Sequence, residues 1–177
     1  MQQAQIGSFQ LVEGITDRQI AQLIEYSTTD PAVRKFSSDA VRFKDRVSFT
    51  TWQNRGRIVY TLVNKSDDLV GIVWFGEFAF PKCEVLSEFK NFQAKNYPFT
   101  FAIRLYKEAR GKGLAKKVAK LALSKFIQTK EYQSKHGGFW LETSHDNIAA
   151  IKTYQSLFVQ VSHPNEHGKI VMVLKNP

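Results

Sequence analysis

The sequence has only one cysteine, few prolines and no long apolar run. Its single thiol, Cys83, excludes an internal disulfide and fits a reducing compartment. No segment approaches the roughly 18 consecutive apolar residues of a membrane span. The N-terminal residues lack the basic and apolar stretches of a signal peptide. We therefore expect a cytoplasmic protein without a membrane partner.

The chain also lacks the features that separate domains. It contains no internal repeat, low-complexity tract or linker rich in Pro, Gly and Ser. Its 177 residues, 43% of them apolar, can form one sizeable hydrophobic core. We predict a single domain over residues 1–177.

Acidic residues are outnumbered, which leaves a formal net charge of +9. Such a balance favours an anionic partner: a nucleic acid, an acidic protein face or a phosphorylated cofactor. The basic residues are interspersed along the chain, with a local concentration from Lys107 to Lys125, and a solvated basic surface explains them equally well. Because no RNA- or DNA-binding motif accompanies the charge, nucleic acid is not the expected partner.

Hydrophobic patterning predicts alternating helices and strands. Thr16 and Gln19 have the spacing of a capping box at a helix start. The expected helices cover residues 17–26, 44–54, about 111–126 and 147–157, and the expected strands cover 9–13, 57–64, 69–78, 99–106, 139–143, 158–162 and 169–174. Residues 28–43, interrupted by Pro31, look irregular, and the aromatic residues in 81–98 indicate a loop that packs on the protein. These elements predict an α/β fold, a mixed sheet covered by helices.

The chemistry-bearing feature is the segment RGKGLA, Arg110 to Ala115, between a predicted strand and a predicted helix. A helix start leaves backbone N–H groups unpaired and carries partial positive charge, so it suits phosphate oxygens. Gly111 and Gly113 have no Cβ to block a close approach. The sequence has neither GxGxxG nor GxxxxGK[ST], which disfavours a dinucleotide or ATP loop. Taken alone, a glycine turn opening an ordinary basic helix is an equal alternative.

A second sequence motif narrows the interpretation of this loop. RxxGxA at Arg110 to Ala115 resembles motif A of the GNAT N-acetyltransferase superfamily, and LETSHDNIAAIKTYQSLF, which contains Glu142, Asn147 and Tyr154, resembles its motif B. The resemblance implies a GNAT-like mixed, mostly antiparallel twisted sheet, with splayed fourth and fifth strands and flanking helices. It also implies acetyl-CoA as the acyl donor. Motif B usually ends in Gly-Phe, whereas this chain has Phe158-Val159, so the helix must end without the glycine cap.

The resemblance carries over to individual positions. The backbone of Ile103 and Leu105 would meet the pantetheine arm, the loop N–H groups would receive the pyrophosphate, and Arg110 would mainly position the loop. Arg104 is unusual in an apolar strand and could line the acceptor groove or meet the cofactor. The implied cofactor-binding residues are Ile103, Leu105, Arg110, Gly111, Lys112, Gly113, Leu114, Ala115, Asn147 and Tyr154.

The expected reaction is direct attack of a neutral amine on the thioester. Tyr154 would point at the sulfur and give the leaving thiolate a proton, and its reference pKa of about 10 suits an acid at neutral pH. Glu142 would accept the amine proton directly or through water. The alternatives are a core tyrosine and a glutamate paired with a lysine. Cys83 could be a nucleophile only with a histidine beside it.

No metal is expected, because His163 and His167 flank a turn without further ligands. His145, beside motif B, is expected in a surface loop. The leading hypothesis is thus an acetyl-CoA-dependent N-acetyltransferase acting on a primary amine of a small molecule, peptide or protein. A catalytically weak or inactive acyl-CoA binder, and less favourably a basic nucleic-acid-binding module, remain open, as does a homodimer.

Overall fold

A computed structural model describes residues 4–174 of the chain. The β-strands are β1 (Ala4–Ile6), β2 (Phe9–Glu13), β3 (Ile58–Val63), β4 (Leu69–Glu77), β5 (Phe99–Leu105), β6 (Phe139–Ser144), β7 (Phe158–Gln160) and β8 (Lys169–Leu174). The α-helices are α1 (Asp17–Thr29), α2 (Pro31–Phe36), α3 (Asp39–Arg42), α4 (Arg46–Gln53), α5 (Ala115–Phe126), α6 (Lys130–Lys135) and α7 (Ile148–Tyr154), with short 3₁₀ turns η1 (Ser87–Phe89) and η2 (Ala94–Asn96). No helix in this range is long and apolar enough to cross a membrane.

The chain divides into two compact units. The first comprises residues up to Phe75 together with Ala102–Phe126, and the second comprises Gly76–Phe101 and the residues from Ile127 on. Each unit is therefore built from segments that are distant in sequence. The single domain over residues 1–177 stays a prediction.

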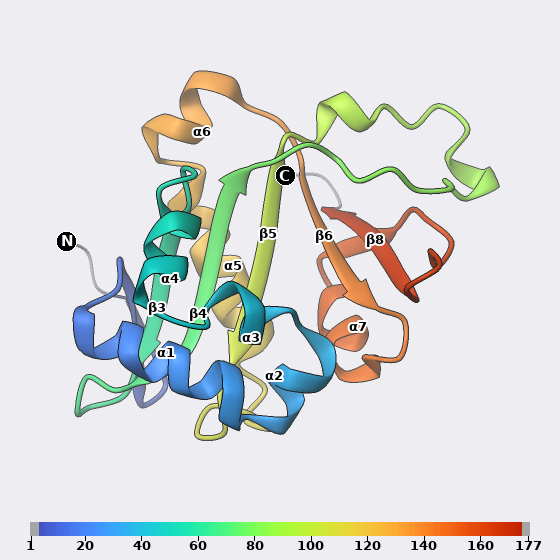
Figure 1. Cartoon of the computed structure of the whole chain (residues 1–177). Helices are drawn as coiled ribbons and strands as arrows, with labels where there is room; N and C mark the ends of the chain where they lie inside the picture. The colour runs from blue at the N-terminus through green and yellow to red at the C-terminus, as the bar shows by residue number, and fades with distance from the viewer. Residues whose placement is uncertain (1–3, 175–177) are drawn as a thin grey trace. The chain divides into compact units, whose positions relative to one another are not determined.

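In the first unit, β1, β2, β3 and β4 pair antiparallel in chain order. Helices α1 to α4 cover one face of these strands and α5 covers the other (Figure 1). The core on the α1–α4 side is aromatic: Trp74 of β4 lies edge-on to Trp52 of α4, with 5.6 Å between the ring centroids. On the opposite face, Phe75 stacks on Phe126 of α5 at 4.4 Å. Because side chains alternate in direction along β4, this one strand packs against both helical layers.

In the second unit, β8 pairs antiparallel with both β6 and β7, and β6 runs parallel to the start of β5. Segment 81–98 packs on one face of these strands, as its aromatic residues predicted. Phe80 and Cys83 belong to this packing, and Val85 forms an isolated antiparallel bridge with Ser162. The face is composed of Trp140, Val161, Val171 and Val173, and the segment contributes Phe89, Phe92 and Tyr97.

The predicted fold class is confirmed: the sheet is mixed and mostly antiparallel, with one parallel pair and flanking helices. Among the described residues, the ladder between β5 and β6 consists of Phe99 opposite Phe139 and Thr100 opposite Trp140. The ladder therefore ends early in both strands. Such an ending fits the splayed fourth and fifth strands that the resemblance implies.

Several predicted boundaries need correction. Segment 28–43 is not irregular but holds α2 and α3, because Asp30 caps α2 and Pro31 occupies its first turn, where no N–H partner is needed. The helix expected from about residue 111 begins only at Ala115, because Gly111 and Gly113 adopt left-handed backbone angles. The capping box of Thr16 and Gln19 is present. Strand β1 and helix α6 were not predicted, and β7 ends at Gln160.

The helix expected over residues 147–157 ends at Tyr154. Gln155 caps it with right-handed angles (φ −54°, ψ −22°), and the Leu157 N–H donates to the Tyr154 carbonyl at 2.8 Å. Within residues 4–174, only Asp67 and His136 among non-glycine residues have positive φ. The missing motif-B glycine is thus replaced by a tight turn that needs no left-handed residue.

Candidate active site

The loop between β5 and α5 has an unusual backbone. The Tyr106 carbonyl accepts hydrogen bonds from the N–H groups of Ala109 (2.9 Å) and Arg110 (3.0 Å), which closes a turn directly after the strand. Gly111 and Gly113 follow with φ of 73° and 65°. A Cβ at either glycine would meet no atom within 4 Å. Glycine is required here by backbone conformation, and the space beside it is open to a ligand.

The loop presents a run of unused hydrogen-bond donors. In the described part of the chain, none of the N–H groups from Gly111 to Lys117 has an acceptor, and intrahelical bonding starts with Val118 donating to Leu114 at 2.9 Å. The last of these groups form the first turn of α5, where the helix dipole adds partial positive charge. Consecutive free N–H groups in such a loop form an anion-binding concavity.

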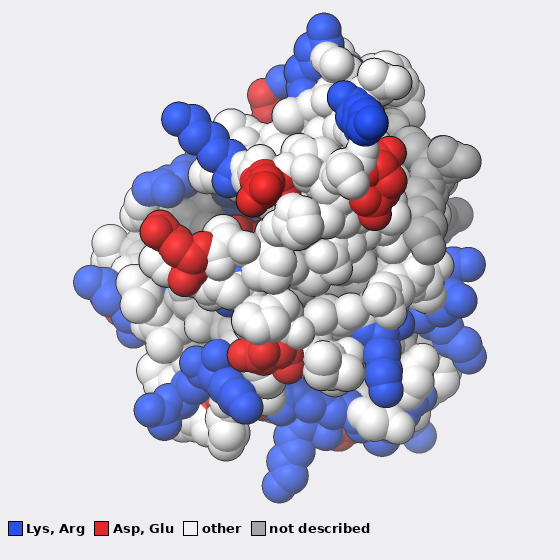
Figure 2. Space-filling view, turned by 90° about the vertical axis from the view of Figure 1, so that its right-hand side faces the viewer, with Lys and Arg blue, Asp and Glu red and all other residues white. Residues whose placement is uncertain are grey.

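Lysines surround the same loop. Lys107, Lys116, Lys117 and Lys120 are exposed, and the Lys112 ammonium lies 5.0 Å from the ring centroid of Phe9 in β2. Elsewhere on the surface the basic side chains are interspersed with acidic ones, as the face in Figure 2 shows. The electrostatics of the loop therefore add to its backbone geometry in favouring phosphate.

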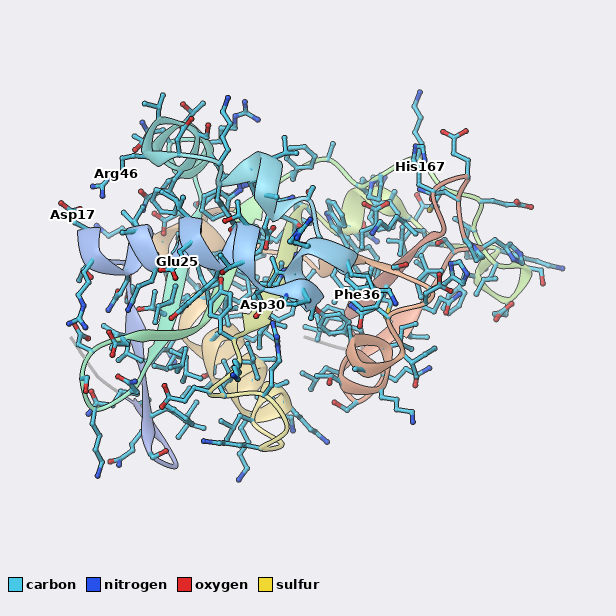
Figure 3. All side chains as sticks on the ribbon, turned by 60° about the horizontal axis from the view of Figure 1, so that its bottom comes forward. Asp17, Glu25, Asp30, Phe36, Arg46 and His167 are labelled. Atoms are coloured by element: carbon cyan, nitrogen blue, oxygen red, sulfur yellow. The ribbon has the colours of Figure 1, made fainter. Side chains whose placement is uncertain are left out.

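Arg110 does not project into this concavity. Its guanidinium forms a bidentate ion pair with Asp30, with Nη1–Oδ1 and Nη2–Oδ2 distances of 2.9 and 2.8 Å. Asp30, labelled in Figure 3, also accepts from the N–H groups of Ala32 and Val33 at the start of α2. Burial alone would raise the pKa of Asp30, but Arg110 and these amides together lower it. The contact ties the loop to the junction of α1 and α2.

Replacing Asp30 with Asn is expected to lower the free energy of unfolding at pH 7 by about 1–3 kcal/mol, because Arg110 loses its carboxylate. The folded-state pKa lies below the unfolded value, so the stabilisation is complete above the unfolded value of about 3.9. It is lost as the pH falls through the folded pKa. Urea denaturation of both proteins between pH 7 and acid should therefore show the difference shrinking below about pH 4.

A matched control is Asp17→Asn. Asp17 pairs with Arg46 at the surface (Figure 3), and its side chain is 87% exposed. Loss of such a pair costs about 0–1 kcal/mol. Equal destabilisation by the two changes would contradict a special role for the pair of Asp30 and Arg110.

The predicted pantetheine contacts lie in β5 of the first unit. Ile103 is buried and Leu105 is partly buried. The carbonyl of Ile103 accepts from Nη1 of Arg104 at 3.0 Å, and Nε of Arg104 donates to Asp39 at 3.1 Å. The Arg104 side chain is thus bound to α3 and to its own strand, a contact with no local sequence signal.

The motif-B residues belong to the second unit. Asn147 caps α7, and its Oδ1 accepts from the Ala150 N–H at 3.2 Å. Asparagine is a favoured cap, so the sequence signal for this contact was present. The Asn147 amide NH₂ has no acceptor within residues 4–174 and can still donate to a ligand.

Tyr154 is the last residue of α7 and is buried, with 6% of its surface exposed. Its ring packs against Phe101 and Phe158, with 6.4 and 6.1 Å between ring centroids. The alternative of a core tyrosine therefore describes its ring correctly. The ring contact joins α7 to β5, because Phe101 belongs to that strand.

Glu142 and Tyr154 lie on opposite faces of the strands in the second unit. Side chains alternate along β6, so exposed Glu142 shares a face with Trp140, and Leu141 points the other way. Since Thr100 is opposite Trp140, Phe101 lies on the Leu141 face, and Tyr154 packs against Phe101. The structure therefore does not place these two predicted catalytic groups side by side.

The remaining candidate residues, a cysteine and a histidine, do not form a second functional site. Burial raises the pKa of the Cys83 thiol, the charge of Glu142 raises it further, and a hydrogen bond with Ser162 acts in the other direction. A protonated thiol is a poor nucleophile. His145 is bound through Nδ1 to the Gly168 carbonyl at 2.8 Å. No group of potential metal ligands occurs among residues 4–174.

A mixed sheet with flanking helices, and a glycine loop with unpaired N–H groups before α5, defines the class: an α/β protein with a helix start open to a ligand. The acetyltransferase (GNAT) family model matches residues 22–158, and the chain belongs to this family. No curated protein matches the sequence.

Solved structures resemble the fold at low identity. Aminoglycoside acetyltransferase AAC(6')-Ib in complex with coenzyme A and kanamycin has a TM-score of 0.66 at 12% identity, covering 94% of this chain and 95% of that chain. Spermidine N-acetyltransferase from Vibrio cholerae in complex with CoA and spermine has a TM-score of 0.62 at 15% identity, covering 93% of both chains.

Proposed function

We propose that the protein transfers an acetyl group from acetyl-CoA to a primary amine of a small molecule, peptide or protein. The observation that carries the proposal is the run of unpaired N–H groups from Gly111 to Lys117, in a loop with open space beside both glycines. Such a loop fits a pyrophosphate, and family membership makes acetyl-CoA the natural donor.

The cofactor contacts follow from this assignment. The N–H groups of Gly111, Lys112, Gly113, Leu114 and Ala115 bind the pyrophosphate, and Arg110 holds the loop through Asp30. The backbone of Ile103 and Leu105 and the free amide donor of Asn147 contact the pantetheine arm. Acetyl-CoA supplies the thioester, and no metal takes part in the proposed reaction.

The chemistry requires one proton acceptor and one proton donor. The amine nitrogen attacks the thioester carbonyl, its proton passes to Glu142 directly or through water, and the C–S bond breaks. Tyr154 donates a proton to the departing sulfur. Because Glu142 and Tyr154 lie on opposite faces of the strands, the amine would lose its proton toward one face, directly or through water, and the sulfur would receive its proton from the other.

Two observations favour a second function, an acyl-CoA-binding protein with weak or no catalysis. Glu142 and Tyr154 lie on opposite faces of the strands, and the motif-B glycine is missing. A nucleic-acid-binding module is supported by net charge alone. A cytoplasmic location and a homodimer stay predictions.

The test is an acceptor panel monitored by release of free CoA thiol, with acetyl-CoA affinity measured in parallel by calorimetry. We expect binding of acetyl-CoA and turnover of at least one primary amine. Tight binding without any turnover would favour the inactive binder. Absence of acetyl-CoA binding, with salt-dependent affinity for nucleic acid, would contradict the proposal altogether.

A further inference from the structure

An arginine cluster, defined as Arg42 and Arg104, lies in the first unit beside β4. The Cζ atom of Arg104 is 5.1 Å from the ring centroid of Trp74, and that of Arg42 is 5.7 Å away. Trp74 is almost fully buried, so its ring is a fixed platform for these two guanidinium groups. Two cations are thus held at one place although their charges repel.

Asp39 of α3 holds the cluster together. Its carboxylate accepts from Nη1 of Arg42 at 2.7 Å and from Nε of Arg104 at 3.1 Å, and its side chain is only 1% exposed. Two guanidinium groups therefore share one buried carboxylate. Burial lowers the pKa of Arg42, Asp39 raises it and the neighbouring charge of Arg104 lowers it. Arg57 likewise has a lowered pKa, from burial first and then from the charge of Arg42.

The cations, unlike the carboxylate, are accessible from solvent. The side chain of Arg42 is 31% exposed and that of Arg104 is 24% exposed. Arg42 donates to Asp39 and to Ser38, and its Nε–H has no acceptor in the described part of the chain. The two guanidinium groups are therefore partly open to solvent, whereas the carboxylate between them is buried.

The cluster includes a residue of β5, the strand expected to hold the cofactor. Arg104 stands in β5 between Ile103 and Leu105, whose backbone is expected to hold the pantetheine arm. We propose that the arginine cluster binds a carboxylate or phosphate group of the acceptor, so that the substrate is a primary amine that also carries an anionic group. This inference rests on the proposed acetyl transfer, because only that function places an acceptor here.

The proposal distinguishes this protein from the two structural neighbours. Kanamycin and spermine, the ligands in those structures, are polycations at neutral pH, and guanidinium groups repel them. The planar guanidinium fork matches carboxylate and phosphate oxygens and binds them with charge-assisted hydrogen bonds. Charge at the acceptor side therefore selects against polycationic amines.

The test compares amines that differ only in the anionic group: β-alanine with β-alaninamide, and glucosamine 6-phosphate with glucosamine. Spermidine and kanamycin represent the cationic class. We expect kcat/KM to be about 10- to 100-fold higher for the anionic member of a pair. Arg42→Gln should remove this preference by raising KM for the anionic amine alone, and Arg42→Lys should restore part of it.

Arg34→Gln is the matched control. Arg34 is exposed in α2, and its side chain makes no hydrogen bond or ion pair with the described residues, so its replacement removes the same charge without breaking a contact. A purely structural role of Arg42 would change KM and kcat for both members of a pair, and Arg34→Gln should change neither. Preference for spermidine or kanamycin, or an unchanged preference in Arg42→Gln, would overturn the proposal.

A binding measurement separates this inference from the proposed function. Glutarate and inorganic phosphate are titrated calorimetrically into protein saturated with CoA, which occupies the β5–α5 loop. We expect the Kd of both anions to rise about tenfold in Arg42→Gln. Such a rise without turnover of any amine supports the anion site and contradicts acetyl transfer. Equal Kd values in wild type and Arg42→Gln contradict the anion site, whatever the turnover.

Discussion

Replacing Gly113 with Asp is expected to raise the Kd for acetyl-CoA about 100-fold or more. Gly113 has a φ of 65°, which an L-residue adopts at a cost of about 1–2 kcal/mol. The new carboxylate would also occupy the open space beside the unpaired N–H groups, where it repels phosphate and competes for its donors. Isothermal titration with acetyl-CoA measures the change.

Two further variants separate the backbone strain from the added charge as causes of the higher Kd. Gly113→Ala introduces the strained conformation without the charge, so its effect should be smaller. Gly56→Asp adds the same charge at an exposed turn glycine with a φ of 75° and open space around it. It should destabilise the fold slightly and leave the Kd within about twofold. An unchanged Kd for Gly113→Asp would show that the loop does not bind the cofactor.

Replacing Tyr154 with Phe is expected to lower kcat by about 100-fold, the usual contribution of a positioned general acid. The ring packing against Phe101 and Phe158 is retained, so the fold and the acetyl-CoA Kd should change little. Because the lost interaction is made in the transition state, kcat and kcat/KM should fall together. Steady-state CoA release, compared with the calorimetric Kd, measures both.

Tyr132→Phe is the control for removing a tyrosine hydroxyl from the same unit. Tyr132 of α6 stacks on Phe139 at 5.6 Å, and no part of the proposed mechanism uses it. Its replacement should leave kcat within about twofold. A kcat for Tyr154→Phe equal to wild type would remove Tyr154 from the mechanism and direct attention to water as the acid.

Segment 28–43 shows where local signals were present but misread. Pro31 suggested an interruption, yet proline is favoured in the first turn of a helix, and Asp30 before it is a strong cap. The same Asp30 then binds Arg110, which is distant in sequence. The cap could have been recognised from the sequence, whereas the ion pair could not.

The relative placement of the two predicted catalytic residues shows a different limit of prediction from sequence. The positions of Glu142 and Tyr154 in a strand and a helix were predictable from motif B. Their placement on opposite faces follows from the β5–β6 register, which pairs Thr100 with Trp140. A register shift of one residue would bring Glu142 and Tyr154 to the same face. Strand alternation alone does not fix that register.

The sequence by itself determined the order of the main elements and the strand–loop–helix unit at Arg110 to Ala115. These features are local: they depend on hydrophobic periodicity, on glycine and on the unpaired N–H groups of a helix start. Tertiary structure alone decided the anchoring of Arg110 by Asp30, the opposite faces of Glu142 and Tyr154, and the gathering of Arg42 and Arg104 around Asp39 and Trp74. Each of these joins residues that are distant in the chain, and only strand register and helix packing bring such residues together.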